Sequence, residues 1–212
     1  MPERSDAELI EGILTGEPAL YEYLIRKYNK RLFRTGMTIL NNDSEVEDAM
    51  QTAYIKAFEH LRDFKNRSSF GTWVTRILIN ECLLQKKNKQ RLKIVQGSHS
   101  EKISIMDTPA KTLINKELAS VLEDAIAGLP EKYRLVFVLR EVEELSVKET
   151  ADVLALEESN IKVRLNRAKS MLRENLSGYV KENIYSFHLT RCDRIVGRVF
   201  KALQIENPGH LV

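Results

Sequence analysis

The chain has 212 residues, of which 43% are hydrophobic and 30% charged, enough apolar material for one large core or two small ones. Nine glycines and five prolines are too few for a typical all-β chain, and a net charge of +3 identifies no partner without local charge placement. Cys82 and Cys192 fit no zinc or thioredoxin spacing, and no apolar run approaches a membrane span, so we expect a cytoplasmic protein.

Helical periodicity dominates the chain, and the sequence predicts an all-α fold. Three Ser-x-x-Glu boxes, which cap helix starts reciprocally, stand where helices should begin, at Ser5, Ser44 and Ser146. The first domain, residues 1–91, is expected to contain four helices, over 6–14, 17–40, 45–61 and 70–89. The stretch 92–112 then loses periodicity, which is typical of a linker.

The helix expected over residues 45–61 presents two different faces. An apolar stripe indicates its core side, formed by Val46, Met50, Ala53, Tyr54, Ala57, Phe58 and Leu61. Asp48, Gln51 and Ile55 fall on one line of the outer face, beside Lys56. An exposed branched apolar residue between polar groups can mark a protein-binding surface, although a plain solvated face fits the same pattern.

The helix expected over residues 70–89 and the loop before it form a candidate nucleic-acid surface. Thr72, Arg76 and Asn80 line up on one face, and the other face carries the apolar stripe. Five basic residues and no acid lie between positions 85 and 100, beginning with Lys86 and Lys87. The loop offers the groups that a pocket for an unstacked base requires, from Phe64, Asn66, Arg67, Ser68 and Ser69. The alternatives are a core role for the aromatic residues and a merely soluble helix end.

The second domain, residues 113–177, has the pattern of a helix-turn-helix. A short helix from Val147 to Leu154 precedes a tight turn and a second amphipathic helix. The second helix buries an apolar stripe and has five basic residues but no acid between positions 161 and 173. Its exposed residues suit DNA readout and are Asn160, Lys162, Val163, Asn166 and Arg167. A helical hairpin that binds no DNA is the alternative.

Two blocks carry a resemblance to a known family. They are VEDAMQTAYIKAFEHL…SSFGTWVTRILINECL and GLPEKYRLVFVLREVEELSVKETADVLALEESNIKVRLNRAKSMLRE. In this order, joined by a linker with no middle domain, they resemble sigma region 2 and sigma region 4 of the extracytoplasmic-function (ECF) group of bacterial sigma factors. The resemblance spans roughly residues 6–176. It implies a factor that binds core RNA polymerase and directs promoter-specific initiation, in a stress or envelope response.

The resemblance also implies roles for the candidate residues. The line Asp48, Gln51 and Ile55, with Lys56, would bind the clamp helices of the polymerase β′ subunit, and the β flap is a further expected contact. The loop 64–69 with Asn80 would hold a flipped base of the −10 element, while Arg76, Lys86 and Lys87 guide the strand. The exposed residues of the second helix would face the −35 element. An anti-sigma factor is an expected partner.

Departures from the family pattern are concentrated in the turn. Ala155 stands where the family usually has glycine, so the turn requires Ala155 to keep a negative φ. Val163 replaces a usual small polar residue of the second helix, and Glu157 and Glu158 precede that helix.

The C-terminal extension, residues 178–212, carries one clean apolar stripe over 189–203, which predicts an amphipathic helix. A regulatory helix and a simple stabilising addition are both open for it. Two other functions fit part of the chain, a helix-turn-helix regulator acting without polymerase and a helical adaptor. An enzyme is the least expected, because the chain has no Gly-rich phosphate loop and its four histidines are scattered. We therefore expect no catalytic residue, cofactor, metal, small-molecule substrate or direct membrane insertion.

Overall fold

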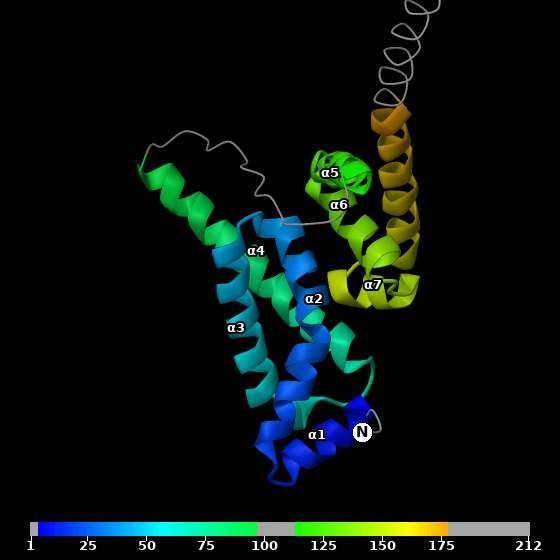
Figure 1. Cartoon of the computed structure of the whole chain (residues 1–212). Helices are drawn as coiled ribbons and strands as arrows, with labels where there is room; N and C mark the ends of the chain where they lie inside the picture. The colour runs from blue at the N-terminus through cyan, green and yellow to red at the C-terminus, as the bar shows by residue number, and fades with distance from the viewer. Residues whose placement is uncertain (1–3, 97–112, 178–212) are drawn as a thin grey trace, which may run out of the picture. The chain divides into compact units, whose positions relative to one another are not determined.

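The computed structural model describes residues 4–96 and 113–177, and every regular element within them is helical (Figure 1). The long elements are α1 (Asp6–Leu14), α2 (Tyr21–Leu40), α3 (Asp43–Glu59), α4 (Phe70–Gln96), α5 (Leu113–Ala127), α6 (Glu131–Phe137) and α7 (Val147–Leu154). Short 3₁₀ turns occupy Pro18–Leu20 and Leu61–Asp63, and a π-helical turn occupies Val138–Val142. A final helix covers residues 158–177. The predicted all-α class is confirmed.

The chain divides into two compact units, residues 1–169 and 170–212. Cys192 and the extension 178–212 lie outside the described residues, as do residues 97–112 of the predicted linker. Among the described helices, none is both long enough and apolar enough to cross a membrane.

Two of the three predicted capping boxes form. Ser5 and Glu8 start α1, and Ser146 and Glu149 start α7, each with both reciprocal hydrogen bonds. The box at Ser44 was wrong, because α3 begins two residues earlier. Asn41 ends α2 in the left-handed region, with φ of 53°, which leaves Asn42 as the cap residue that accepts from the Glu45 amide at 2.9 Å.

The boundaries of two helices also differ from the prediction. Pro18 directs residues 18–20 into a 3₁₀ turn, so α2 begins at Tyr21 and not at position 17. The fourth helix continues to Gln96, past its predicted end near Lys89 and into the predicted linker. Residues 90–96 contain no glycine or proline, so nothing in the local backbone stops the helix there.

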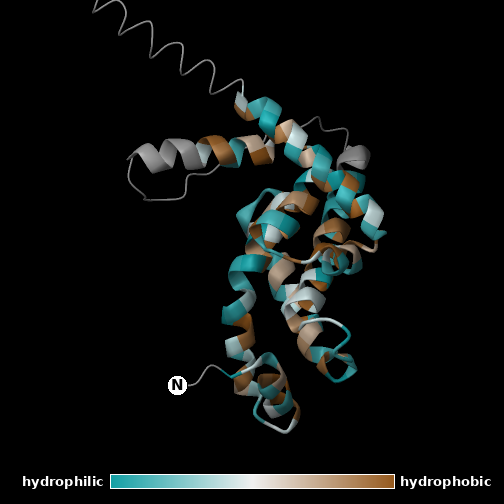
Figure 2. Ribbon diagram, turned by 90° about the vertical axis from the view of Figure 1, so that its right-hand side faces the viewer, coloured by the Kyte–Doolittle hydropathy of each residue, from teal (hydrophilic) through white to brown (hydrophobic). Residues whose placement is uncertain are grey.

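One hydrophobic core unites the N-terminal helices with the C-terminal ones. α2, α3 and α4 pack on one another and bury most of the predicted stripes, and Figure 2 shows apolar and polar residues on each helix. Side chains of α6, of the π-helical turn, of the loop after it and of α7 join the same cluster, namely Leu135, Leu139, Leu145 and Val153. The fold therefore holds α6 and α7 against α2 and α4 by apolar burial.

Two of three predicted positions lie in a different environment from the one expected. Phe58 was expected in the core but is 40% exposed, with its ring 5.1 Å from that of Tyr21. Thr72 was expected on an outer face but is buried, because α7 covers it. Cys82 is buried as expected, and burial raises the pKa of its thiol to about 12, so it packs as an inert apolar residue.

Replacing Ala155 with glycine is expected to stabilise the protein. The turn places Ala155 at φ of 51°, so the requirement for a negative φ is not met. A left-handed conformation costs a non-glycine residue about 1–2 kcal/mol. Glycine loses about 0.4–1 kcal/mol more than alanine through unfolded-state entropy, so the net gain should be about 0.5–1 kcal/mol. Urea denaturation measures it, and an unchanged or lower midpoint would contradict this account of the turn.

Candidate protein and nucleic-acid interfaces

The outer face of α3 has the predicted composition. Asp48 and Gln51 are exposed, and the side chain of Ile55 is 51% exposed one turn further along. Lys56 is different, because its ammonium lies 2.6 Å from the carboxylate of Glu81 on α4 and is only partly exposed. The face available to a partner therefore consists of Asp48, Gln51 and Ile55. The exposed ring of Phe58 adds an apolar group to this helix that the sequence pattern had assigned to the core.

The loop before α4 rests on an aromatic cluster. The Phe64 ring lies 5.0 Å from that of Trp73 and 6.0 Å from that of Phe70, which is fully buried. Phe64 is thus partly buried and supports the loop from below. The Ser69 hydroxyl accepts from the Thr72 amide at 3.1 Å and fixes the start of α4. Aromatic packing and this cap together hold the loop at one end of α4.

The polar groups of this surface remain accessible. Asn66 and Arg67 are exposed, Ser68 is partly exposed, and Asn66 adopts a φ of 52° that turns the loop. Arg76 and Asn80 are exposed on α4, one turn apart. The predicted set therefore presents amide, guanidinium and hydroxyl groups at the surface, and Phe64 supports the loop.

The basic end of α4 is partly engaged within the chain. Lys86 forms an ion pair with Glu131 at the start of α6. Lys87, its neighbour, is exposed. Lys89 pairs with Glu45 of α3. The predicted strand-guiding role therefore requires Lys86 to exchange Glu131 for another anion.

The helix 158–177 exposes the residues predicted for DNA readout. Asn160, Lys162, Asn166 and Arg167 are exposed, and Val163 is 54% exposed among them. Ile161 and Ala168 are fully buried on the opposite face, so the register of the helix is as predicted.

Two neighbours of this surface were missed by the sequence pattern. Arg164 donates to the Asn160 side chain at 2.8 Å, and Arg167 donates to the Tyr133 hydroxyl at 3.4 Å. The hydrogen bond from Arg167 lowers the pKa of Tyr133. The i, i+4 spacing of Asn160 and Arg164 was a signal that the sequence offered.

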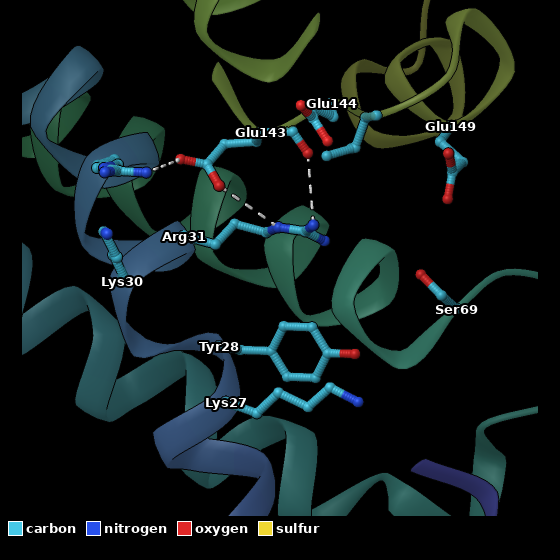
Figure 3. Close-up of a pocket in the computed structure, with 10 residues that line it drawn as sticks. Lys27, Tyr28, Lys30, Arg31, Ser69, Glu143, Glu144 and Glu149 are labelled. Carbon is cyan, nitrogen blue, oxygen red and sulfur yellow. Dashed lines mark hydrogen bonds and ion pairs between the residues drawn. The ribbon is translucent and has the colours of Figure 1, made fainter. Parts of the chain in front are cut away.

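A polar cavity of about 450 Å³ lies between α2 and residues 143–149 (Figure 3). Four basic side chains of α2 line it, together with Ser69 and three glutamates. The Glu143 carboxylate is almost completely buried, 3.6 Å from Arg31 Nε and 3.4 Å from a terminal nitrogen of Arg34. Arg31 also donates to the Glu143 carbonyl at 3.4 Å. The sequence pattern did not predict this site, because Arg31 and Glu143 lie 112 positions apart.

Further polar contacts cross the same interface. Thr72 of α4 donates to the carboxylate of Glu149 at 3.1 Å. The Ser146 amide is the main cause of the lowered pKa of Glu149, so this carboxylate is stabilised as an anion. Arg134 of α6 donates to the Thr38 carbonyl at 2.8 Å, which links α6 to the end of α2. Ion pairs, hydrogen bonds and the shared core together define a closed arrangement of residues 1–169.

Comparison with known proteins matches two stretches of the chain to family models. Residues 24–92 match the model of sigma-70 region 2, and residues 120–172 match that of sigma-70 region 4. Together these stretches cover more than half of the chain. Both overlap the candidate surfaces described above.

Curated relatives and solved structures agree with these matches. The chain is 25% identical to the RNA polymerase sigma-H factor of Pseudomonas aeruginosa, over 86% of this chain and 99% of that one. It is 26% identical to the ECF sigma factor SigW of Bacillus subtilis, over 79% and 94%. The fold is similar to the sigma factor RpoE in complex with the anti-sigma factor NepR from Bartonella quintana, with a TM-score of 0.63, 21% identity and 74% and 96% coverage. CnrH in complex with the cytosolic domain of CnrY has a TM-score of 0.57, 22% identity and 82% and 97% coverage.

Proposed function

This chain belongs to the sigma-70 family and is an ECF RNA polymerase sigma factor that directs promoter-specific initiation. From this premise we propose a separate role for each of its two domains. Residues 1–91 bind core polymerase and recognise the −10 element. Residues 113–177 recognise the −35 element, and residues 92–112 connect the two. The observation that carries the proposal is the order of the two matched regions, each with an exposed polar face in the described structure.

The α3 face binds the β′ clamp helices of the polymerase. Asp48 and Gln51 supply an anionic group and an amide, and Ile55 supplies an apolar contact one turn further along α3. A partner that covers the half-exposed Ile55 lowers the free energy of the complex, because apolar surface leaves water. Lys56 holds α3 to α4 through Glu81, so its role is to position the face.

The exposed face of the first half of α4, with Arg76 and Asn80, and the loop before the helix bind the −10 strand. Asn80 and the loop groups Asn66, Arg67 and Ser68 offer hydrogen bonds to a flipped base, and Arg76 offers one to the backbone. Phe64 supports this loop through its contacts with Phe70 and Trp73.

The helix 158–177 enters the major groove of the −35 element. Arg167 and Lys162 suit guanine or phosphate, and Asn166 suits adenine. Val163 presents an apolar surface, which suits the methyl group of thymine.

Promoter binding requires the closed arrangement to open. The −10 and −35 positions differ by roughly 25 base pairs, which is about 85 Å along B-DNA at about 3.4 Å per base pair. The two domains cannot span that distance while Leu139 and Leu145 share a core with α2 and α4. Opening also releases Lys86 from Glu131. We infer that an anti-sigma factor binds the chain and keeps polymerase from the α3 face.

Replacing Asn80 with alanine is expected to weaken −10 strand binding by roughly 10- to 100-fold, as loss of a base-reading amide costs about 1–3 kcal/mol. The reconstituted holoenzyme first selects its preferred strand from a random single-stranded pool, and fluorescence anisotropy then measures affinity for that strand. Asn88→Ala is the matched control, an exposed amide two turns further along α4. Equal affinities for wild type and Asn80→Ala would refute this assignment.

A further inference from the structure

The helix α2 carries a row of four basic side chains, which we call the basic row: Lys27, Lys30, Arg31 and Arg34. Spacings of three, four and seven residues place them on one face of an α-helix. The row extends over about 10 Å at about 1.5 Å per residue. All four side chains line the same cavity (Figure 3).

The acid that occupies the basic row in this structure is held loosely. Glu143 lies 3.6 Å from Arg31 Nε and 3.4 Å from Arg34. Charge-assisted hydrogen bonds between guanidinium and carboxylate groups are usually about 2.7–2.9 Å long. Arg34 also keeps 44% of its side chain exposed. This geometry suits an occupant that another anion can replace.

Opening of the closed arrangement removes the three cavity glutamates from the basic row. The glutamates that line the cavity are Glu143, Glu144 and Glu149. All three belong to the second domain, residues 113–177, which separates from α2 when the arrangement opens. Lys27 keeps Asp6 of α1 as a partner at 2.7 Å. Among the described lining residues, the basic row, Tyr28 and Ser69 remain, with no lining carboxylate beside Arg31 and Arg34. Such a concentration of positive charge attracts a polyanion.

The position of Ser69 favours DNA as that polyanion. Ser69 is the last residue of the loop 64–69, which contacts the −10 base in the proposed function, and it lines the same cavity as the basic row. A strand held at the loop therefore has the basic row beside it. We propose that the basic row binds the phosphate backbone of the displaced promoter strand, and that Glu143 occupies this surface in the closed chain. The proposal rests on the proposed function.

Loss of charge in the basic row is expected to reduce the salt dependence of strand binding. Each lost phosphate contact lowers the slope of log affinity against log salt by about 0.7 for a single strand. Lys30→Gln should lower it by about 0.7 and Lys30→Gln/Arg34→Gln by about 1.4, with about fivefold weaker binding per charge near 0.1 M salt. The measurement uses holoenzyme and the selected strand described above.

The matched control is Arg26→Gln on the same helix. Arg26 does not line the cavity and already pairs with Glu22 at 2.6 Å, so its removal should leave the slope unchanged. In the free chain, Glu143→Gln should raise affinity for the strand about fivefold, because it removes a competing carboxylate.

The outcomes separate this inference from the proposed function. Equal slopes for wild type, Lys30→Gln and Lys30→Gln/Arg34→Gln would overturn the inference, while the loss in Asn80→Ala would still support −10 recognition. Equal salt slopes for these three proteins, together with weaker binding of a polyglutamate peptide by the two basic-row variants, would assign the basic row to an acidic protein partner. That result would also overturn the inference. If the wild-type holoenzyme selects no single strand from the pool, that result would contradict the proposed function itself.

Discussion

Replacing Glu143 with arginine is expected to open the closed arrangement of residues 1–169. The Glu143 side chain is 7% exposed and faces Arg31 and Arg34, so the substitution places three cations together. Breaking a buried ion pair costs about 3–5 kcal/mol. Because Arg31 and Arg34 are 29% and 44% exposed, solvent screening reduces the expected loss to about 2 kcal/mol, roughly 30-fold in the closed-to-open ratio.

Solution scattering and hydrogen exchange measure this opening. The radius of gyration should rise, and the Leu145 amide, which donates to the Leu139 carbonyl at 3.0 Å in the closed form, should exchange faster. Glu157→Arg makes the same charge change at an exposed position of the turn and serves as the control. Unchanged scattering and exchange in Glu143→Arg would show that this contact does not hold the closed form.

The double substitution Asp48→Ala/Gln51→Ala is expected to weaken binding to core polymerase by at least about tenfold, or about 1.4 kcal/mol. Both side chains are exposed, so the change should leave folding stability within about 0.5 kcal/mol. The reduced affinity would then report lost contacts and not an unfolded chain.

A matched control removes the same two chemical groups elsewhere. Glu11 and Asn29 are exposed on α1 and α2, and Glu11→Ala/Asn29→Ala deletes one carboxylate and one amide away from the α3 face. Titration of labelled core polymerase measures both variants. Equally weakened binding by the two double variants would show that the effect comes from the net charge of the chain and not from the α3 face. Unchanged binding by Asp48→Ala/Gln51→Ala would place the polymerase contact elsewhere.

The faces of single helices were predictable because they depend on local spacing. The exposed line Asp48, Gln51 and Ile55 and the exposed face of the helix 158–177 follow from a 3.6-residue period that burial then respects. The caps at Ser5 and Ser146 were predictable for the same reason, since a capping box spans only four residues.

Contacts between distant segments were not predictable from such spacing. Glu143 and Arg31 lie 112 positions apart, and Thr72 and Glu149 lie 77 apart. Nothing in the sequence near Thr72 indicates that α7 will cover it, and Phe58 fitted the apolar stripe by period alone. Asn42, and not Ser44, is the N-cap of α3, because the left-handed conformation of Asn41 fixes where α3 can begin.

Transcription in vitro shows whether this chain directs core polymerase to promoters. Core polymerase, genomic fragments and the purified chain are combined, and the 5′ ends of the transcripts are mapped. We expect transcripts that start at discrete sites only when the chain is added, and fewer of these transcripts with Asp48→Ala/Gln51→Ala. Transcription start sites that do not depend on the chain would contradict this function. The same holds if the chain binds duplex DNA but never changes the start sites.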